Sequence, residues 1–326
     1  MVKRNRLLSY LREQRGSWVS GELLSHRLAI SRAAIWKHIH SLKQAGYLIE
    51  SSPKKGYLFR QAPEFLLPEE IRYSLKTKVF GAKEIFYFKE IDSTNEKAKS
   101  LAVEGKPEGT LVVAESQTKG RGRRGRKWFS PPGGGIYLSM LLRPKVAPHQ
   151  AYKITLMTAV AVAEAVLAML PSLNVKIKWP NDILVDGKKM AGILTEISTD
   201  MDVVDFIVVG LGLNVNIDSF PEELEGQATS VSMCTKGSFP RSALIRAYLQ
   251  YFEKYYGIFG KGGFNVIMHR WRELSDIIGQ DVMVDIMGEK HVGEATDVDD
   301  EGVLILKDSR GVVQRIFSGD VMLLRS

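Results

Sequence analysis

Cysteine and histidine are scarce in this chain of 326 residues, which has one Cys and six His. A lone cysteine, Cys234, excludes an internal disulfide and any metal site that needs two thiolates. The histidines show no clustered spacing, so a structural zinc site is not expected and no metal ligands are assigned. The amino terminus, MVKRNR, lacks the apolar core and the small-residue cleavage site of a signal peptide.

Long apolar runs are also scarce. The longest, roughly 154–170, is interrupted by Thr155, Thr158 and Glu164, and we expect it to be too short to span a bilayer. A hydrophobic content of 44% with 25% charged residues is ordinary for a globular protein, and the length allows two or three domains. We therefore expect a cytoplasmic protein without a membrane partner.

The net charge of +8 is concentrated in two places. Residues 1–60 contain twelve Lys and Arg against three Asp and Glu, whereas the rest of the chain contains 33 against 34. Within that rest, six cationic side chains lie between Lys119 and Lys127. Each concentration implies an anionic partner.

The first concentration coincides with a pattern typical of a winged helix-turn-helix. Helical spacing predicts one helix over 5–15, a second after Ser20 and a third from Ser31 to Gly46. The inner face of the second helix is expected to be Leu23, Leu24 and Leu28. A hairpin with its turn at Pro53-Lys54-Lys55-Gly56 would form the wing.

The outward face of the third helix is the predicted DNA-reading surface, because it combines positive charge with small and aromatic groups. The expected DNA-binding residues are Arg32, Ala33, Trp36, Lys37 and Lys43, with Lys54 and Lys55 in the wing. His40 lies on the same face. A small helical bundle that mediates protein contacts is the alternative, but the charge of the segment argues against it.

The second concentration is the basic loop, KGRGRRGRKW, residues 119–128. Glycines let backbone N–H groups approach an anion while Arg and Lys supply charge, although a solvated hairpin tip is the simpler interpretation. The loop contains G-x-G-x-x-G, but Pro131 and Pro132 prevent the helix that a dinucleotide site needs. Lys-Ser/Thr does not follow the last glycine, and no H-R-D or D-F-G triplet occurs, which excludes a P-loop and a kinase.

Other stretches predict the secondary structure around the basic loop. Strands are expected at 110–114 and 136–142, on either side of it. Ser93 and Glu96 make a capping box for a helix that runs to about Glu104, and the same hydroxyls could instead donate to a ligand. Both interpretations remain open.

The stretch 175–196, VKIKWPNDILVDGKKMAGILTE, predicts a hairpin that turns at Asp186-Gly187. Gly192 lies inside its second strand, where a glycine weakens the sheet unless something approaches the backbone. Antiparallel strands with helices on one face predict an α+β layer. Residues 277–326 predict a small β-barrel, for which we expect a stabilising role.

In this order, GRGRRG, KWPND and K-x-AGI make the chain resemble the bifunctional biotin protein ligases that also repress the biotin operon. The resemblance covers the whole chain. It implies a winged helix-turn-helix domain at 1–63, a class II synthetase-like ligase core with a mixed or antiparallel sheet at 64–274, and an SH3-like barrel at 275–326.

The resemblance also implies a reaction. Biotin and ATP, with Mg²⁺ on the nucleotide, would form biotinyl-5′-adenylate, and the biotinyl group would pass to a lysine of a biotin carboxyl carrier protein. The adenylate would act as corepressor, and ligand binding would favour a homodimer on operator DNA.

The resemblance assigns site residues by motif. The implied catalytic residues are Arg121, Arg123, Asp182 and Lys189, with Asp182 orienting or deprotonating the acceptor lysine. The implied biotin-binding residues are Ser93, Thr94, Asn95, Gln117, Gly120, Arg121, Arg123, Lys189 and Gly192. The implied residues for ATP and the adenylate are Arg123, Arg124, Trp128, Lys178, Asn181, Lys189 and Asn214.

Two alternatives remain. A lipoate ligase would need a longer apolar slot, and that family does not normally carry a winged helix. A transcription regulator that only senses a ligand would not need the positive cluster around an α-phosphate.

The six like charges of the basic loop 119–128 repel one another, so we expect this loop to become ordered only when ligand arrives.

Overall fold

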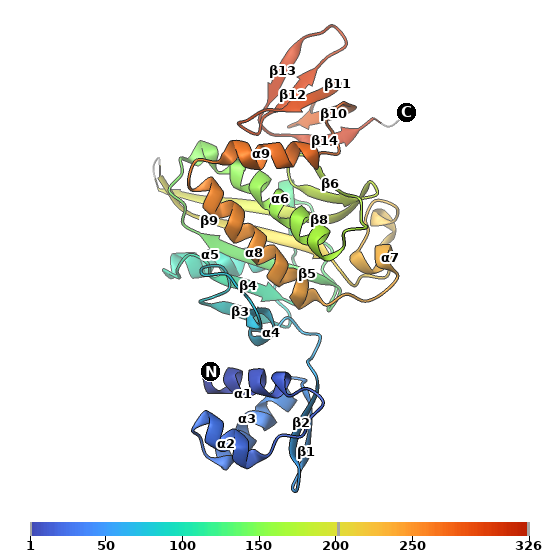
Figure 1. Cartoon of the computed structure of the whole chain (residues 1–326). Coiled ribbons are helices and arrows are strands. Elements are labelled where there is room, and N and C mark those ends of the chain that lie inside the picture. The colour runs from blue at the N-terminus through green and yellow to red at the C-terminus, as the bar shows by residue number, and fades with distance from the viewer. Residues whose placement is uncertain (1, 201–202, 325–326) are drawn as a thin grey trace. The chain divides into compact units, whose positions relative to one another are not determined.

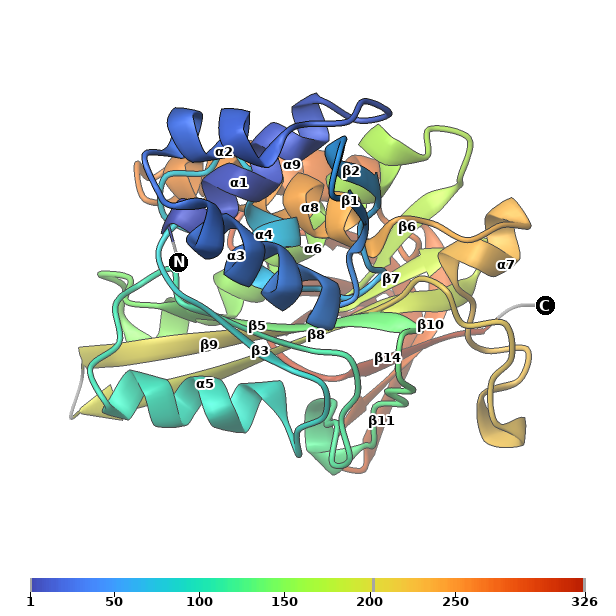
Figure 2. The same ribbon diagram turned by 90° about the horizontal axis from the view of Figure 1, so that it is seen from below.

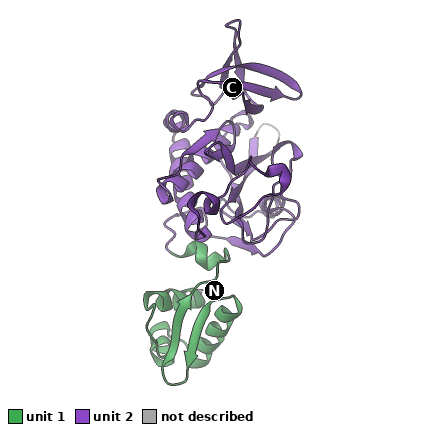
Figure 3. Cartoon of the chain, turned by 90° about the vertical axis from the view of Figure 1, so that its right-hand side faces the viewer, with its two compact units in different colours: residues 1–73 green, residues 74–326 purple. Residues whose placement is uncertain are grey.

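The computed structural model describes residues 2–200 and 203–324. The chain forms two compact units, residues 1–73 and 74–326 (Figure 3).

The first unit is a winged helix-turn-helix. Its elements are α1 (Val2–Glu13), α2 (Gly21–Leu28), α3 (Arg32–Gln44), β1 (Leu48–Ser52), β2 (Gly56–Gln61) and α4 (Pro68–Arg72). The predicted starts of the second and third helices are confirmed, because the Ser20 and Ser31 hydroxyls cap them by accepting from the backbone N–H groups of Leu23 and Ala34. One core prediction is wrong: Leu23 is 47% exposed. Successive helical residues turn by about 100°, so Leu24 and Leu28 point inward while Leu23 does not.

The first unit extends to Tyr73, which places residues 64–73 with it although the sequence assigned them to the next domain. Arg4 donates to Glu69 at 2.8 Å, and Arg12 pairs with Glu70. The Tyr47 hydroxyl also donates to Glu70. These interactions hold α4 to the helices and wing, so the separation of the two units follows α4.

The second unit is built on a seven-stranded mixed sheet, which confirms the predicted sheet type (Figure 1). Its order is β3 (Ile85–Phe88), β4 (Leu111–Ala114), β5 (Gly135–Leu142), β9 (Val203–Asn214), β8 (Lys188–Asp200), β7 (Asp182–Val185) and β6 (Val175–Lys178). Only β3 and β4 pair in parallel among these neighbours. The predicted turn between β7 and β8 is confirmed, with positive φ at Asp186 and Gly187.

Helices cover both faces of this sheet, so the expectation of helices on one face is wrong. α5 (Thr94–Val103) packs on one face, whereas α6 (Tyr152–Met169) and α8 (Arg241–Phe259) lie on the other (Figure 2). All eight residues of β5 are accordingly buried. Its side chains alternate between the two faces, so one covering layer could not bury them all.

The helix α6 also corrects the argument about apolar length. The segment Pro148–Met169, 22 residues with a mean hydropathy of 1.5, is long and apolar enough to cross a membrane by length and composition. It packs instead against α8, α9 (Phe264–Glu273) and the sheet. Most of its residues are buried inside the protein, as expected for a core helix.

The carboxyl-terminal sheet has five antiparallel strands in the order β13-β12-β11-β10-β14. They are β10 (Gln280–Ile286), β11 (Glu289–Val298), β12 (Leu304–Lys307), β13 (Val313–Ile316) and β14 (Asp320–Leu323). The remaining elements are α7 (Val231–Thr235) and the short 3-10 helices η1 (Arg123–Gly125), η2 (Pro148–Gln150) and η3 (Glu222–Leu224). The Trp179 indole N–H donates to the carbonyl of Gly302 at 3.2 Å, which anchors this sheet beside the KWPND stretch.

Candidate active site

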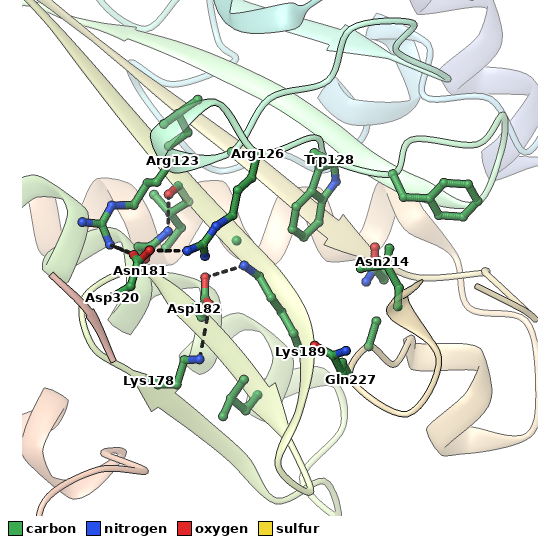
Figure 4. A pocket seen from close by; sticks show the side chains of 18 of the residues that line it. Arg123, Arg126, Trp128, Lys178, Asn181, Asp182, Lys189, Asn214, Gln227 and Asp320 are labelled. Atoms are coloured by element: carbon green, nitrogen blue, oxygen red, sulfur yellow. Dashed lines mark hydrogen bonds and ion pairs between the residues drawn. The ribbon is translucent and has the colours of Figure 1, made fainter. Parts of the chain in front are cut away.

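A cavity of about 640 Å³ in the second unit is walled by five segments of the chain (Figure 4). They are the basic loop, the β6–β7–β8 hairpins, the end of β9, the segment 220–228 and the start of β14. Nine of the residues assigned from the resemblance line it: Arg121, Arg123, Trp128, Lys178, Asn181, Asp182, Lys189, Gly192 and Asn214. The fold therefore brings most of the assigned nucleotide and catalytic residues to one place.

Asp182 lies between two lysines in this cavity. Its Oδ1 is 2.7 Å from Nζ of Lys189, and its Oδ2 is 3.9 Å from Nζ of Lys178. The three residues belong to adjacent strands, and the Asp182 side chain is only 13% exposed. The carboxylate therefore holds both ammonium groups at the cavity wall.

Trp128 lies flat over a pair of glycines. Gly192 and Gly212 face each other across β8 and β9. A Cβ atom at Gly192 would be 2.9 Å from the indole, and one at Gly212 would be 2.3 Å from it. Lys189 Nζ lies 5.4 Å from the ring centroid. The predicted close approach to Gly192 is thus confirmed, and the approaching groups are Trp128 and the Lys189 side chain.

Arg123 is held by groups on two sides. Its Nη1 donates to Oδ1 of Asn181 at 3.2 Å and to the carbonyl of Gly319 at 3.3 Å, and it lies 3.6 Å from Asp320. Burial lowers the pKa of Arg123, although the carboxylates of Asp320 and Asp182 oppose the shift. The guanidinium remains cationic, because its ordinary pKa is far above neutrality.

Asp320 forms ion pairs with several arginines of the basic loop. Arg124 Nη1 lies 3.4 Å from its Oδ2, and Arg126 pairs with the same oxygen. Arg124 also reaches Asp285 at 3.3 Å. Arg124 does not line the cavity, so its assignment to the nucleotide remains a prediction that its placement does not support.

A second group of assigned residues forms a buried network at the start of α5, outside the cavity wall. Thr94 donates to Oε1 of Gln117 from its backbone N–H at 2.9 Å and from its hydroxyl at 3.1 Å. The Ser139 hydroxyl is 2.8 Å from Thr94 and 2.6 Å from Asn95 Oδ1. Ser93 and Gly120 flank the network, and a Cβ on Gly120 would be 2.7 Å from the Trp128 carbonyl.

The predicted capping box is wrong. The Ser93 side chain makes no cap hydrogen bond, and Gln117 receives the first amide of the helix instead. The Glu96 carboxylate forms ion pairs with Arg121 and, at 2.5 Å, with Lys99. Tertiary partners have therefore replaced the local cap.

Two further polar residues lie near the assigned groups, Asn214 in the cavity and Glu196 beside α5. The buried Asn214 donates to the carbonyl of Thr229 at 3.1 Å, and its side-chain oxygen has no partner among the residues described. Burial raises the pKa of Glu196, but hydrogen bonds from Asn95 and Lys99 and the charge of Arg121 outweigh it, so that pKa lies below its ordinary value.

The cavity also includes residues from two segments that no assignment touched, among them Phe220, Gln227, Asp320 and Val321. The Gln227 carbonyl accepts from the backbone N–H of Lys189 at 2.8 Å, which fixes the segment 220–228 beside the hairpin. The acidic Asp320 belongs to the sheet that was expected only to stabilise the fold. No local signal marks these residues, because each joins the site through chain-distant packing.

The first unit presents a separate basic surface. Arg32, Ala33, Trp36, Lys37, His40 and Lys43 on α3 are all exposed, as are Lys54 and Lys55 in the wing, which confirms their predicted outward orientation. Trp36 is 60% exposed and stacks on His40 with a centroid separation of 5.4 Å. The residues Ile35, Ile39 and Leu42 are buried beneath.

Three family models match successive parts of the chain. An HTH domain matches residues 3–58, the biotin/lipoate A/B protein ligase family matches 87–214, and the biotin protein ligase C terminal domain matches 277–324. They correspond to the winged helix-turn-helix, the central sheet with the basic loop, and the carboxyl-terminal sheet.

Relatives extend the similarity over the full chain. A bifunctional ligase/repressor BirA of Bacillus spizizenii is 39% identical over 98% of this chain and 98% of that protein. The one of Escherichia coli is 32% identical over 94% of each. Among solved structures, a biotin protein ligase from Aquifex aeolicus in complex with biotin and ATP matches with a TM-score of 0.65 and 30% identity, covering 75% of this chain and 100% of that one. The chain therefore belongs to the biotin/lipoate A/B protein ligase family, among its bifunctional ligase/repressor members.

Proposed function

We propose that this protein activates biotin with ATP as biotinyl-5′-adenylate and transfers the biotinyl group to a lysine of a biotin carboxyl carrier protein. The observation that carries the proposal is one cavity lined by Arg121, Arg123 and Lys189 together with Trp128 and Asn214. Attack of a carboxylate on an α-phosphate brings two anions together. Cations held in place before the reaction lower that barrier.

Each part of the cavity has a role in this proposal. Lys189, Arg121 and Arg123 face the biotin carboxylate and the α-phosphate, and Lys178 assists them. Trp128 offers an aromatic surface for adenine, and the unpartnered oxygen of Asn214 suits an amino group of the base. Asp182 orients the acceptor lysine, since it already holds two ammonium groups of its own chain.

Biotin is proposed to contact the start of α5 and the neighbouring strands. Thr94, Asn95 and Gln117 form a hydrogen-bonded network there, and a ureido ring needs such partners for its donors and acceptors. Mg²⁺ is proposed to arrive with the nucleotide. Within residues 2–200 and 203–324, no group of three or more His, Cys, Asp or Glu side chains could hold a metal ion.

The first unit is proposed to bind operator DNA with the exposed cations of α3 and the wing, as part of a homodimer whose formation biotinyl-5′-adenylate favours. The three domains are proposed as predicted, 1–63, 64–274 and 275–326, except that residues 64–73 go with the first of them, in a cytoplasmic protein. Unchanged sedimentation of the protein on addition of the adenylate would contradict the dimerisation mechanism.

One assay tests the proposed chemistry. ATP–pyrophosphate exchange is measured with biotin, with lipoate and with neither. Exchange that depends on biotin is the expected result. Exchange with lipoate would indicate a lipoate ligase, and no exchange with either acid would indicate a regulator that only senses its ligand.

A further inference from the structure

The helix α3 holds a large apolar ring in water. The Trp36 side chain is 60% exposed, although its neighbours Ile35 and Ile39 are buried in the core of the first unit. Its outward direction follows from the helical period, so it does not result from a frayed or loosely packed end. An indole left open on a packed helix indicates a surface that a partner covers.

The indole of Trp36 is also held in one orientation. It stacks on the His40 ring, one turn later, with a centroid separation of 5.4 Å and an interplanar angle of 12°. The His40 Nε2 atom is 3.1 Å from Nε2 of Gln44, a further turn along the helix. The stack covers one face of the indole and leaves the rest open. A ring that is already positioned loses little conformational entropy when it binds.

The charge around Trp36 indicates what kind of partner covers it. Arg32 and Lys37 are exposed on the same helix, whose sequence RAAIWKHIHSLKQ contains no acidic residue. A nucleic acid combines phosphates for these cations with base edges for the ring. Of the groups that base pairs present in the major groove, the C5 methyl of thymine is the apolar one, whereas the others donate or accept hydrogen bonds.

We propose that Trp36 is a specificity-determining residue that recognises thymine, by packing the open part of its indole against the C5 methyl group in the major groove. The inference rests on the proposed DNA binding of the first unit and names the base that this surface selects. Trp36 lies in the amino-terminal half of α3, which is the part of a recognition helix that approaches base edges. Neighbouring cations that contact phosphates would fix the register without selecting a base.

The test removes the methyl group from the DNA and the indole from the protein. The probe is a duplex selected from random-sequence DNA by the full-length parent in the presence of biotin and ATP. Each thymine of that duplex is replaced singly by deoxyuridine, which lacks the C5 methyl and keeps the base pair. Fluorescence anisotropy gives the affinities of the parent, of Trp36→Ala and of Leu48→Ala. Leu48 is a matched control, because it is an apolar side chain of the first unit that is 58% exposed on β1.

The proposal predicts a specific coupling between the two changes. In the parent, deoxyuridine at one or more positions in each half of the site should weaken binding by about fourfold, the cost of leaving one methyl group in water. Trp36→Ala should bind thymine and deoxyuridine equally at those positions, whereas Leu48→Ala should discriminate as the parent does. The salt dependence of binding by Trp36→Ala should equal that of the parent, because the indole neutralises no phosphate.

Two results would overturn the proposal. One is equal discrimination against deoxyuridine in Trp36→Ala and in the parent, and the other is no effect of deoxyuridine at any position. Either would indicate that the exposed indole contacts a protein and not a base. Failure of the proposed DNA binding itself would look different, since the selection would then enrich no sequence at all.

Discussion

Asp182 Oδ1 lies 2.7 Å from the Nζ atom of Lys189, across the adjacent strands β7 and β8. Lys189 also crosses Gly192 and approaches Trp128. The Lys189 ammonium group therefore lies beside the Asp182 carboxylate, beside Gly192 and beside the Trp128 ring of the basic loop. Such a position suits a group that must reach a reacting phosphate without rearrangement.

Replacing Lys189 by Ala should reduce adenylate formation by roughly a thousandfold, because it removes a positioned charge from the reacting phosphate. Biotin-dependent pyrophosphate exchange measures this step directly. Lys188→Ala is the control, since Lys188 is the exposed neighbour on the same strand. Near-parent exchange in Lys189→Ala would refute the role.

Replacing Arg123 by Gly should leave adenylate formation measurable but speed adenylate release by about tenfold or more. Arg123 joins the basic loop to Asn181 and to Gly319 by hydrogen bonds. Without them the loop should hold the bound adenylate less firmly. The off-rate of labelled adenylate is the measurement, with Arg310→Gly as a control at a side chain that is 81% exposed. Release slower than in the parent would contradict this account.

Replacing Gly212 by Ala should displace the Trp128 indole, because the added Cβ would lie 2.3 Å from it. We expect a red shift of tryptophan fluorescence and at least about a tenfold loss of exchange activity. Gly237→Ala serves as control, since its Cβ would meet nothing within 4 Å. An unchanged emission spectrum would show that Trp128 does not rest on this glycine pair.

A ligase that lacks residues 1–73 should aggregate less than one that lacks residues 1–63. The shorter truncation leaves Glu69, Glu70 and Leu67 without Arg4, Arg12 and the core of the first unit. Both truncations should lose DNA binding and keep exchange activity. Sedimentation velocity compares their aggregation, and an equally monodisperse 64–326 fragment would argue against the observed unit boundary.

Replacing Lys54 and Lys55 by Ala should lower the salt dependence of operator binding by about 0.9 in the log–log slope for each phosphate that is no longer neutralised. Arg60→Ala is the control on the same hairpin, because Arg60 is already paired with Glu50 at 2.7 Å. Fluorescence anisotropy at several salt concentrations gives the slope. A slope equal to that of the parent would remove the wing from the proposed DNA surface.

Local patterns were sufficient for much of this protein. Helical periodicity and serine caps predict the helix-turn-helix, and an Asp-Gly turn predicts the β7–β8 hairpin, because these signals act within a few residues. Gly192 could be singled out in the same way, since a glycine inside a strand implies that another group approaches its backbone. Resemblance then supplied the residue roles, nine of which converge on one cavity.

Tertiary structure decided the rest. Ser93 and Glu96 look like a capping box in sequence, but Gln117 takes the helix amide and Arg121 takes the carboxylate. Asp320 lies almost two hundred residues from the basic loop and carries no motif, yet it partners three loop arginines. Local sequence determines which groups the chain can offer, whereas long-range packing determines which of them meet, because a stronger distant partner displaces a weaker local one.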